Sequence, residues 1–201
     1  NVMAYYPLNQ STGTVVTDIV NGRDGEFDGG MDDSNWVVAR SGNGLELDGS
    51  TDDFYVGSGN FSLANQSFTF SIWEKRGSEG SDDWLYSQGT SSANLGLHFG
   101  YRSSNVFALG FWSNDLNSSA YTGTGNWRHW VLSYDAPNKT QAIYHNGVLI
   151  TSRNTTYDYQ GTGTLYVGSR FGGANYDGTI DDVLIYDRPL TELEVKALYE
   201  Q

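Results

Sequence analysis

The fold is decided by two neighbouring stretches, "WRHWVLSYD" (residues 127–135) and "AIYHNGVLI" (residues 142–150). Three apolar residues of the first stretch recur at every second position: Trp130, Leu132 and Tyr134. A period of two is typical of a strand that buries one face. In the second stretch Asn146-Gly147 stands between two extended runs, and both residue types tolerate positive φ. We therefore expect a type I′ β-hairpin there.

The same alternation occurs in three further stretches, "SFTFSIWE" (67–74), "NLGLHFG" (94–100) and "NVFALGFW" (105–112). Their apolar faces are expected to consist of Phe68, Phe70 and Ile72, then Leu95, Leu97 and Phe99, and finally Phe107, Leu109 and Phe111. Strands that recur about every 8 to 15 residues, with almost no helix between them, are typical of a β-sandwich or a barrel. The sequence therefore predicts an all-β fold.

Only the C-terminal end has a helical pattern. Thr191 suits an N-cap, Glu194 completes a capping box, and Leu190 with Val195 can form a hydrophobic staple. One side of this short helix is expected to carry Leu193, Ala197 and Leu198. With no repeat and no interior linker, residues 1–201 are expected to form a single antiparallel β-sandwich domain with a short C-terminal helix.

Composition limits the partners of the chain. Eleven basic and 24 acidic residues give a formal charge of −13, which argues against a nucleic-acid partner or an anionic membrane surface, because both are polyanions. There is no cysteine, so disulfides and thiolate chemistry are excluded. No apolar run approaches the ~18 residues of a membrane span, and no membrane insertion is expected.

Two adjacent aspartates, Asp181 and Asp182, begin the apolar run "TIDDVLIY" near the C-terminus. Successive side chains of a strand point to opposite faces, so regular alternation would turn one of the two inward. A buried carboxylate is costly unless it is paired, hydrogen-bonded or bound to a metal. The pair therefore predicts a buried polar contact.

Six segments, taken in order, resemble the laminin-G-like members of the concanavalin A-like lectin/glucanase superfamily. They are "AYYPLNQSTGTVVTDIVNGRDGEFDGG", "GNGLELDGSTDDFYV", "SFTFSIWEK", "GNWRHWVLSYD", "AIYHNGVLI" and "DGTIDDVLIYDRPLTELEVKALY". The resemblance spans nearly the whole chain and implies a jelly roll of two curved antiparallel sheets. It leaves function open, because the superfamily includes lectins, adhesion domains, glycosidases and polysaccharide lyases.

The sequence contains no recognisable motif of catalytic residues. Glycosidases need two facing carboxylates, and the Glu-x-Asp-x-x-Glu strand motif of the glucanase branch is absent. Three histidines, His98, His129 and His145, are isolated from one another on expected strands. Tyr144 and His145, residue types used by lyases on this fold, are adjacent and so point to opposite faces. We therefore expect no enzymatic activity and no catalytic residues.

Hard oxygen ligands are abundant in the loop "TDIVNGRDG", which offers Asp18, Asn21 and Asp24 within seven residues. In the family that the chain resembles, this loop commonly lies beside the end of the final strand, with a structural calcium between them. The resemblance also implies a polar residue where Leu184 stands on an outer face, so Asp181 is expected to point inward. We predict a Ca²⁺ site formed by Asp18, Asn21, Asp24 and Asp181, with Asp182 on the solvent side. The alternative is that Asp18 and Asp24 only shape an Asx-turn loop and that Asp181 pairs with an arginine or with backbone amides.

Ligand-binding residues are expected in loops, where aromatic rings can stack on sugars and polar groups can bind hydroxyls. The candidates are the aromatic residues Trp84, Tyr101, Trp112 and Tyr176, with Asp82, Asp83 and Arg170 as polar partners. Single exposed aromatics are common, so only their convergence in space would support a site.

The sequence therefore predicts a non-catalytic carbohydrate-binding or adhesion module with structural calcium. We expect a monomeric module of a larger secreted or cell-surface protein, located outside the cell, whose partner is a glycan or polysaccharide or a cell-surface protein. Two alternatives remain open. One is a protein- or peptide-binding adhesion domain, and the other is a polysaccharide hydrolase or lyase.

Overall fold

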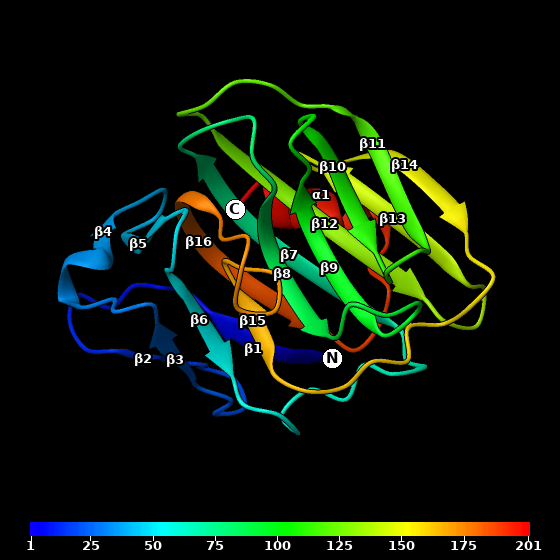
Figure 1. Ribbon diagram of the computed structural model, residues 1–201, viewed down its shortest axis with the longest axis horizontal. Helices are drawn as coiled ribbons and strands as arrows, with labels where there is room; N and C mark the ends of the chain where they lie inside the picture. The colour runs from blue at the N-terminus through cyan, green and yellow to red at the C-terminus, as the bar shows by residue number, and fades with distance from the viewer.

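The computed structural model describes residues 1–201 as two antiparallel sheets packed face to face, with one short helix (Figure 1). Sheet A has the order β14 (Val148–Asn154), β13 (Thr140–His145), β12 (Trp127–Asp135), β7 (Phe68–Arg76), β16 (Asp177–Tyr186), β5 (Asn43–Asp48) and β4 (Trp36–Val38), with β1 (Val2–Tyr6) paired to β16. Sheet B has the order β11 (Asp115–Ala120), β10 (Val106–Gly110), β9 (Gly96–Tyr101), β8 (Asp83–Gly89), β15 (Leu165–Val167), β6 (Asp53–Val56), β3 (Gly25–Asp28) and β2 (Val15–Val16). A 3₁₀ turn, η1 (Asp33–Asn35), precedes β4. The fold is therefore the predicted antiparallel sandwich.

The core lies between the sheets and is largely aromatic. One cluster of 35 buried residues runs from Ala4 to Ile185 and contains almost every apolar position predicted from the alternation. Trp130 of sheet A stacks on Phe107 of sheet B with ring centroids 3.7 Å apart and the rings nearly parallel. Leu95 is an exception, because it precedes β9 and is 37% exposed. Large rings at alternating strand positions therefore hold the sheets together.

The predicted hairpin and helix are confirmed. Asn146 and Gly147 have φ of 49° and 78°, as a type I′ turn between β13 and β14 requires. Helix α1 (Glu192–Tyr199) begins with the expected capping box between Thr191 and Glu194.

Helix α1 packs on the outer face of sheet A, which is the face turned away from sheet B. Leu190 and Val195 are buried there against Val131 and Tyr144. Of the three residues expected on one side of the helix, Leu193 and Ala197 are exposed and Leu198 is half-buried, and Val195 takes the buried position. The helix is far too short to cross a lipid bilayer, and no other helix could do so.

A β-bulge interrupts β16 at the paired aspartates. Asp181 lies opposite Trp73 of β7, but the next paired residue, Leu184, lies opposite Ser71. Asp182 takes a left-handed backbone with φ of 48°, so Ile180 and Val183 both face the core although they are three residues apart. Asp181 is fully buried, but it points to the outer face of sheet A with Trp73 and not into the core. The expectation of an inward-facing Asp181 fails because it assumed regular alternation.

A buried carboxylate joins the two sheets. Glu74 of β7 accepts hydrogen bonds from the Tyr101 hydroxyl of β9 at 2.7 Å, from the Trp130 indole nitrogen at 3.0 Å and from the Tyr176 hydroxyl. Arg128 donates to the Tyr101 hydroxyl at 3.0 Å and so brings a positive charge to the network. Burial raises the pKa of Glu74, and the three hydrogen bonds oppose that shift without cancelling it.

Replacing Glu74 with alanine should lower the free energy of unfolding by about 3 kcal/mol or more, because three buried donors lose their acceptor. Urea denaturation followed by tryptophan fluorescence measures the change. Glu46→Ala is a matched control, because Glu46 is exposed on β5 and should change stability by less than about 0.5 kcal/mol. Equal effects of the two substitutions would contradict a structural role for the network.

Candidate functional site

Four of the seven predicted ligand-binding residues converge over the outer face of sheet B. The Arg170 guanidinium lies 4.8 Å from the ring centre of Trp84 and 5.5 Å from that of Trp112. Asp82 approaches Arg170 at 3.7 Å, which is too long for a hydrogen bond. The Arg170 side chain makes no hydrogen bond within the protein and is one quarter exposed. These four residues therefore form one contiguous group.

Two tight turns present aromatic rings to this group. Trp112 and Ser113 connect β10 to β11 with φ of 62° and 61°, closed by a hydrogen bond from the Phe111 amide to the Asn114 carbonyl at 3.2 Å. Phe171 and Gly172 form a second turn with φ of 57° and 74°, closed by two hydrogen bonds between Arg170 and Gly173. Positive φ at both central residues is the mark of type I′ turns, which favour asparagine and glycine.

The rings of Trp112 and Phe171 lie 6.1 Å apart, and both side chains are half-buried. A bulky residue in the left-handed region is a genuine outlier that costs about 1 to 3 kcal/mol. The fold thus holds two aromatic rings together in strained positions beside an arginine. The sequence did not single out Phe171, although its place between Arg170 and Gly172-Gly173 marks a tight turn. We name Trp84, His98, Trp112, Arg170 and Phe171 the aromatic–arginine cluster.

Small residues form the floor of this face. On β9 the outward positions hold Gly96, His98 and Gly100, so His98 is the only large side chain among them. Gly110 on β10 is needed, because a Cβ there would lie 2.4 Å from both His98 Nε2 and an Asp115 oxygen. His98 packs edge-on against both indoles, at 4.8 Å from Trp84 and 5.6 Å from Trp112.

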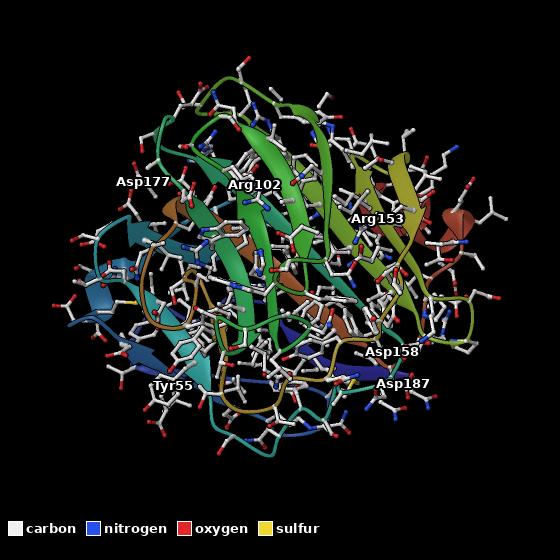
Figure 2. The ribbon with its side chains drawn as sticks, turned by 45° about the vertical axis from the view of Figure 1, so that its right-hand side comes forward. Tyr55, Arg102, Arg153, Asp158, Asp177 and Asp187 are labelled. Carbon is white, nitrogen blue, oxygen red and sulfur yellow. The ribbon has the colours of Figure 1, made fainter.

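Charged groups at the edge of the cluster are nearly balanced. Arg102, at the end of β9 (Figure 2), donates to Asp115 at 2.8 Å and lies 5.7 Å from the Trp84 ring centre. Burial raises the pKa of Asp115, but the contacts and charges of His98 and Arg102 outweigh burial and leave the pKa below its usual value. Asp115 is therefore an ionised acceptor. His98 was not predicted because it lies inside β9. Arg102, directly after β9, and Asp115, the first residue of β11, border polar loops and were not singled out.

The other predicted ligand-binding residues are structural. Tyr101 and Tyr176 are fully buried and donate to Glu74. Asp83 is buried in an ion pair with Arg76, with distances of 2.6 and 2.9 Å. Trp84 belongs to the cluster but is also fully buried, so it supports Arg170 and cannot itself contact a ligand. Polar loops flank these residues in the sequence, but the opposite sheet or neighbouring loops cover them.

The predicted calcium ligands bind the backbone. Each carboxylate oxygen of Asp18 accepts two hydrogen bonds from backbone amides. One oxygen accepts from Tyr5 and Val20, and the other accepts from Asn21 and Arg23. These four bonds use all four lone-pair sites of the carboxylate.

The remaining predicted ligands are similarly engaged. Asn21 donates its side-chain amide to the carbonyls of Val2 and Met3, and Asp24 accepts from the Asp18 amide. Asp181 accepts from the amides of Ser41 and Asp182, within sheet A and the β4–β5 turn.

These residues do not fit the predicted calcium site. Tyr5, and not a shared ion, connects the loop with the aspartate pair, because its amide donates to Asp18 and its hydroxyl donates to Asp182 at 2.6 Å. No group of three or more acidic or histidine side chains is placed to hold a metal. The geometry matches the alternative, because Asp18 and Asp24 accept amide hydrogen bonds within their own loop and Asp181 accepts two backbone amides.

The chain belongs to the concanavalin A-like lectin/glucanases superfamily, whose family model matches residues 48–196. No curated protein matches the sequence. Among solved structures, the chain is similar to domain 4 of AbnA, a GH43 extracellular arabinanase from Geobacillus stearothermophilus, in complex with arabinotriose. The TM-score is 0.79 and the sequence identity is 20%, and the match covers 99% of this chain and 98% of that one.

Two further structures are similar over part of their length. The binding domain of Paraclostridial Mosquitocidal Protein 1 has a TM-score of 0.77 and 19% identity, over 99% of this chain and 52% of that one. Trypanosoma rangeli sialidase in complex with 2,3-difluorosialic acid has a TM-score of 0.71 and 18% identity, over 98% of this chain and 32% of the enzyme. At these identities the similarity concerns the fold.

Removing calcium with EDTA is expected to leave the midpoint of thermal unfolding unchanged, because the Asp18 carboxylate has no free lone pair for an ion. Differential scanning calorimetry in EDTA and in calcium chloride measures this. A rise of several degrees with calcium would restore the metal site that the family resemblance implies.

Asp181 should give stability a dependence on pH. Burial is the largest cause that raises the pKa of Asp181 to about 6, so the folded state binds this proton more tightly than the unfolded state does. Asp181 therefore makes its full contribution to the unfolding free energy below about pH 4, and this contribution is lost as the pH rises to about 6.

Asp181→Asn should therefore reduce the fall in unfolding free energy between pH 4 and pH 7 by about 2 kcal/mol. The measurement is urea denaturation of both proteins across that range. Asp53, whose pKa burial also raises to about 6, is present in both proteins and cancels in the comparison. Parallel pH profiles would contradict the assignment.

Proposed function

We propose that the chain is a non-catalytic glycan-binding module whose ligand binds at the aromatic–arginine cluster. Sugar rings stack on aromatic faces, and planar charged groups bind their hydroxyls. The single observation that carries the proposal is the pairing of Trp112 and Phe171, two half-exposed rings held 6.1 Å apart by strained turns beside Arg170. Strain of this kind persists where the surrounding structure maintains it for a function.

The arrangement of charges supports binding over catalysis. A glycosidase needs one carboxyl group with a raised pKa as its general acid. Near the cluster Asp115 is held ionised by Arg102 and His98, and Asp82 lies next to Arg170. The Asp82 side chain is 38% exposed, so its carboxylate can accept hydrogen bonds from sugar hydroxyls.

Similarity to a domain of an extracellular arabinanase that was solved with arabinotriose supports the same ligand class, since the match covers nearly all of both chains. By the same reasoning we place the module in a larger secreted or surface protein. The charge of −13 suits a neutral glycan better than a highly anionic one. Calcium has no part in the proposed contacts.

Trp112→Asn should abolish most glycan binding without unfolding the protein. Asparagine tolerates the left-handed backbone that strains tryptophan. The relief of about 1 kcal/mol of backbone strain therefore offsets the loss of packing by the indole ring. We expect binding at least tenfold weaker, because aromatic anchors often contribute about 2 kcal/mol or more, and an unchanged unfolding midpoint. A glycan array identifies the ligand, and isothermal titration calorimetry measures the affinity.

Phe171→Asn should reproduce this result, and Trp127→Ala should leave binding intact, since Trp127 is a half-buried tryptophan on sheet A. Running the array with calcium and with EDTA separates direct recognition from metal-assisted recognition. Full affinity in both asparagine variants, or release of sugars from polysaccharides by the isolated chain, would contradict the proposal. Binding to cell-surface protein but to no glycan would favour an adhesion domain.

A further inference from the structure

A pocket lies on the side of the molecule opposite the aromatic–arginine cluster, on the outer face of sheet A beside α1. Its volume is about 160 Å³, and its walls come from β1, β7, β12, β16, the β4–β5 turn and α1. In Figure 1 helix α1 lies behind sheet A, whereas the loop between β15 and β16 passes in front near β8. The pocket is thus separate from the aromatic–arginine cluster.

Arg40 brings an unpaired positive charge to this pocket. Its guanidinium stacks 3.6 Å from the ring centre of Trp73, and that indole is also stacked with Tyr199 at 5.5 Å. Arg40 makes no hydrogen bond within the protein, and none of its nitrogens lies within 4.0 Å of a carboxylate oxygen. A guanidinium held flat on an aromatic ring leaves its N–H edge available to a carboxylate in a bidentate contact.

Asp182 brings a negative charge to the same pocket. The bulge in β16 turns its half-buried carboxylate into the pocket, where one oxygen accepts from Tyr5 and the other has no protein partner. Bulges are over-represented next to functional sites, because they redirect a side chain. The paired aspartates of the sequence thus have two roles, since Asp181 stabilises the β4–β5 turn and Asp182 lines the pocket.

A further polar group in the pocket also lacks a partner. His129 is 1% exposed, and its Nε2 lies 2.8 Å from the Ser71 hydroxyl, but its Nδ1 has no hydrogen-bond partner. Burial lowers the pKa of His129 to about 3, so the ring is neutral at physiological pH. The pocket therefore offers one cation, one anion and a neutral ring nitrogen, with apolar walls from Leu184, Tyr186 and Leu198.

The geometry points to a binding site for a small zwitterion, of which a free α-amino acid is the simplest example. Its carboxylate would bind the Arg40 guanidinium, its ammonium group would bind Asp182, and its side chain would lie against Leu184 and Leu198. A simple anion is disfavoured by the carboxylates of Asp182 and the neighbouring Asp181. A sugar cannot stack on Trp73, because Arg40 and Tyr199 already stack on it.

Titration calorimetry of the intact chain with L-leucine, N-acetyl-leucine and leucine amide tests this site. N-acetyl-leucine lacks the ammonium group and leucine amide lacks the carboxylate. We expect each blocked compound to bind at least tenfold more weakly than leucine, because each loses a charge-assisted hydrogen bond. A panel of free amino acids then defines the preferred side chain.

Arg40→Gln and Asp182→Asn should each weaken leucine binding at least tenfold, and asparagine retains the left-handed backbone at position 182. Trp112→Asn is the control and should bind leucine normally, because it alters only the opposite face. Equal binding of leucine and its blocked derivatives, unchanged affinity in both pocket variants, or no binding by any free amino acid would overturn the proposal.

Discussion

The position of the two sheets depends on the buried carboxylate of Glu74. It accepts hydrogen bonds from a tyrosine of sheet B, a tryptophan of sheet A and a tyrosine in the loop before β16, so three separate segments share one acceptor. Two residues further along β7, Arg76 forms a second cross-sheet contact, a buried ion pair with Asp83, and lies 4.0 Å from the Tyr101 ring centre. Apolar packing alone permits small slides between sheets, whereas hydrogen bonds with fixed geometry do not.

This constraint extends to the aromatic–arginine cluster. Asp83, which pairs with Arg76 inside the sandwich, is followed directly by Trp84, which lies on the outer face under Arg170. On β9, Tyr101 bonds to Glu74 inside, and Arg102 lies on the outside beside Asp115. The strands that carry the proposed ligand contacts are thus fixed by polar bonds on their inner faces, which preorganises the surface for binding.

The sequence predicted the fold well because its signals are local. Alternation identified the inner faces, Asn146-Gly147 identified a hairpin, and the Thr191–Glu194 pair identified the start of the helix. The site was predicted only in part. Trp112 and Arg170 were found because they lie in polar loops, but Tyr176 lies beside the same kind of loop and is buried.

A bulge explains the failed prediction for Asp181. The register of β16 shifts after Asp181, and that of β8 shifts between Trp84 and Tyr86. An assignment that assumes regular alternation of side chains therefore places the residues after each bulge on the wrong face of the sheet. A bulge depends on the neighbouring strands and has no signature in a single sequence. The distance between Asp181 and the loop of Asp18 is likewise a property of the assembled sheets.

Left-handed backbone occurs at both proposed sites. Seven residues other than glycine and asparagine have positive φ: Leu8, Trp112, Ser113, Lys139, Phe171, Ala174 and Asp182. Four of them lie in the two turns of the cluster or at the bulge beside the pocket at α1, Ala174 directly follows the second turn, and Leu8 and Lys139 lie elsewhere. Left-handed backbone costs about 1 to 2 kcal/mol for residues other than glycine, asparagine and aspartate, and glycine or asparagine would remove most of that cost. Stability alone would therefore favour other residues at Trp112 and Phe171, which supports the proposed role of these two rings in binding.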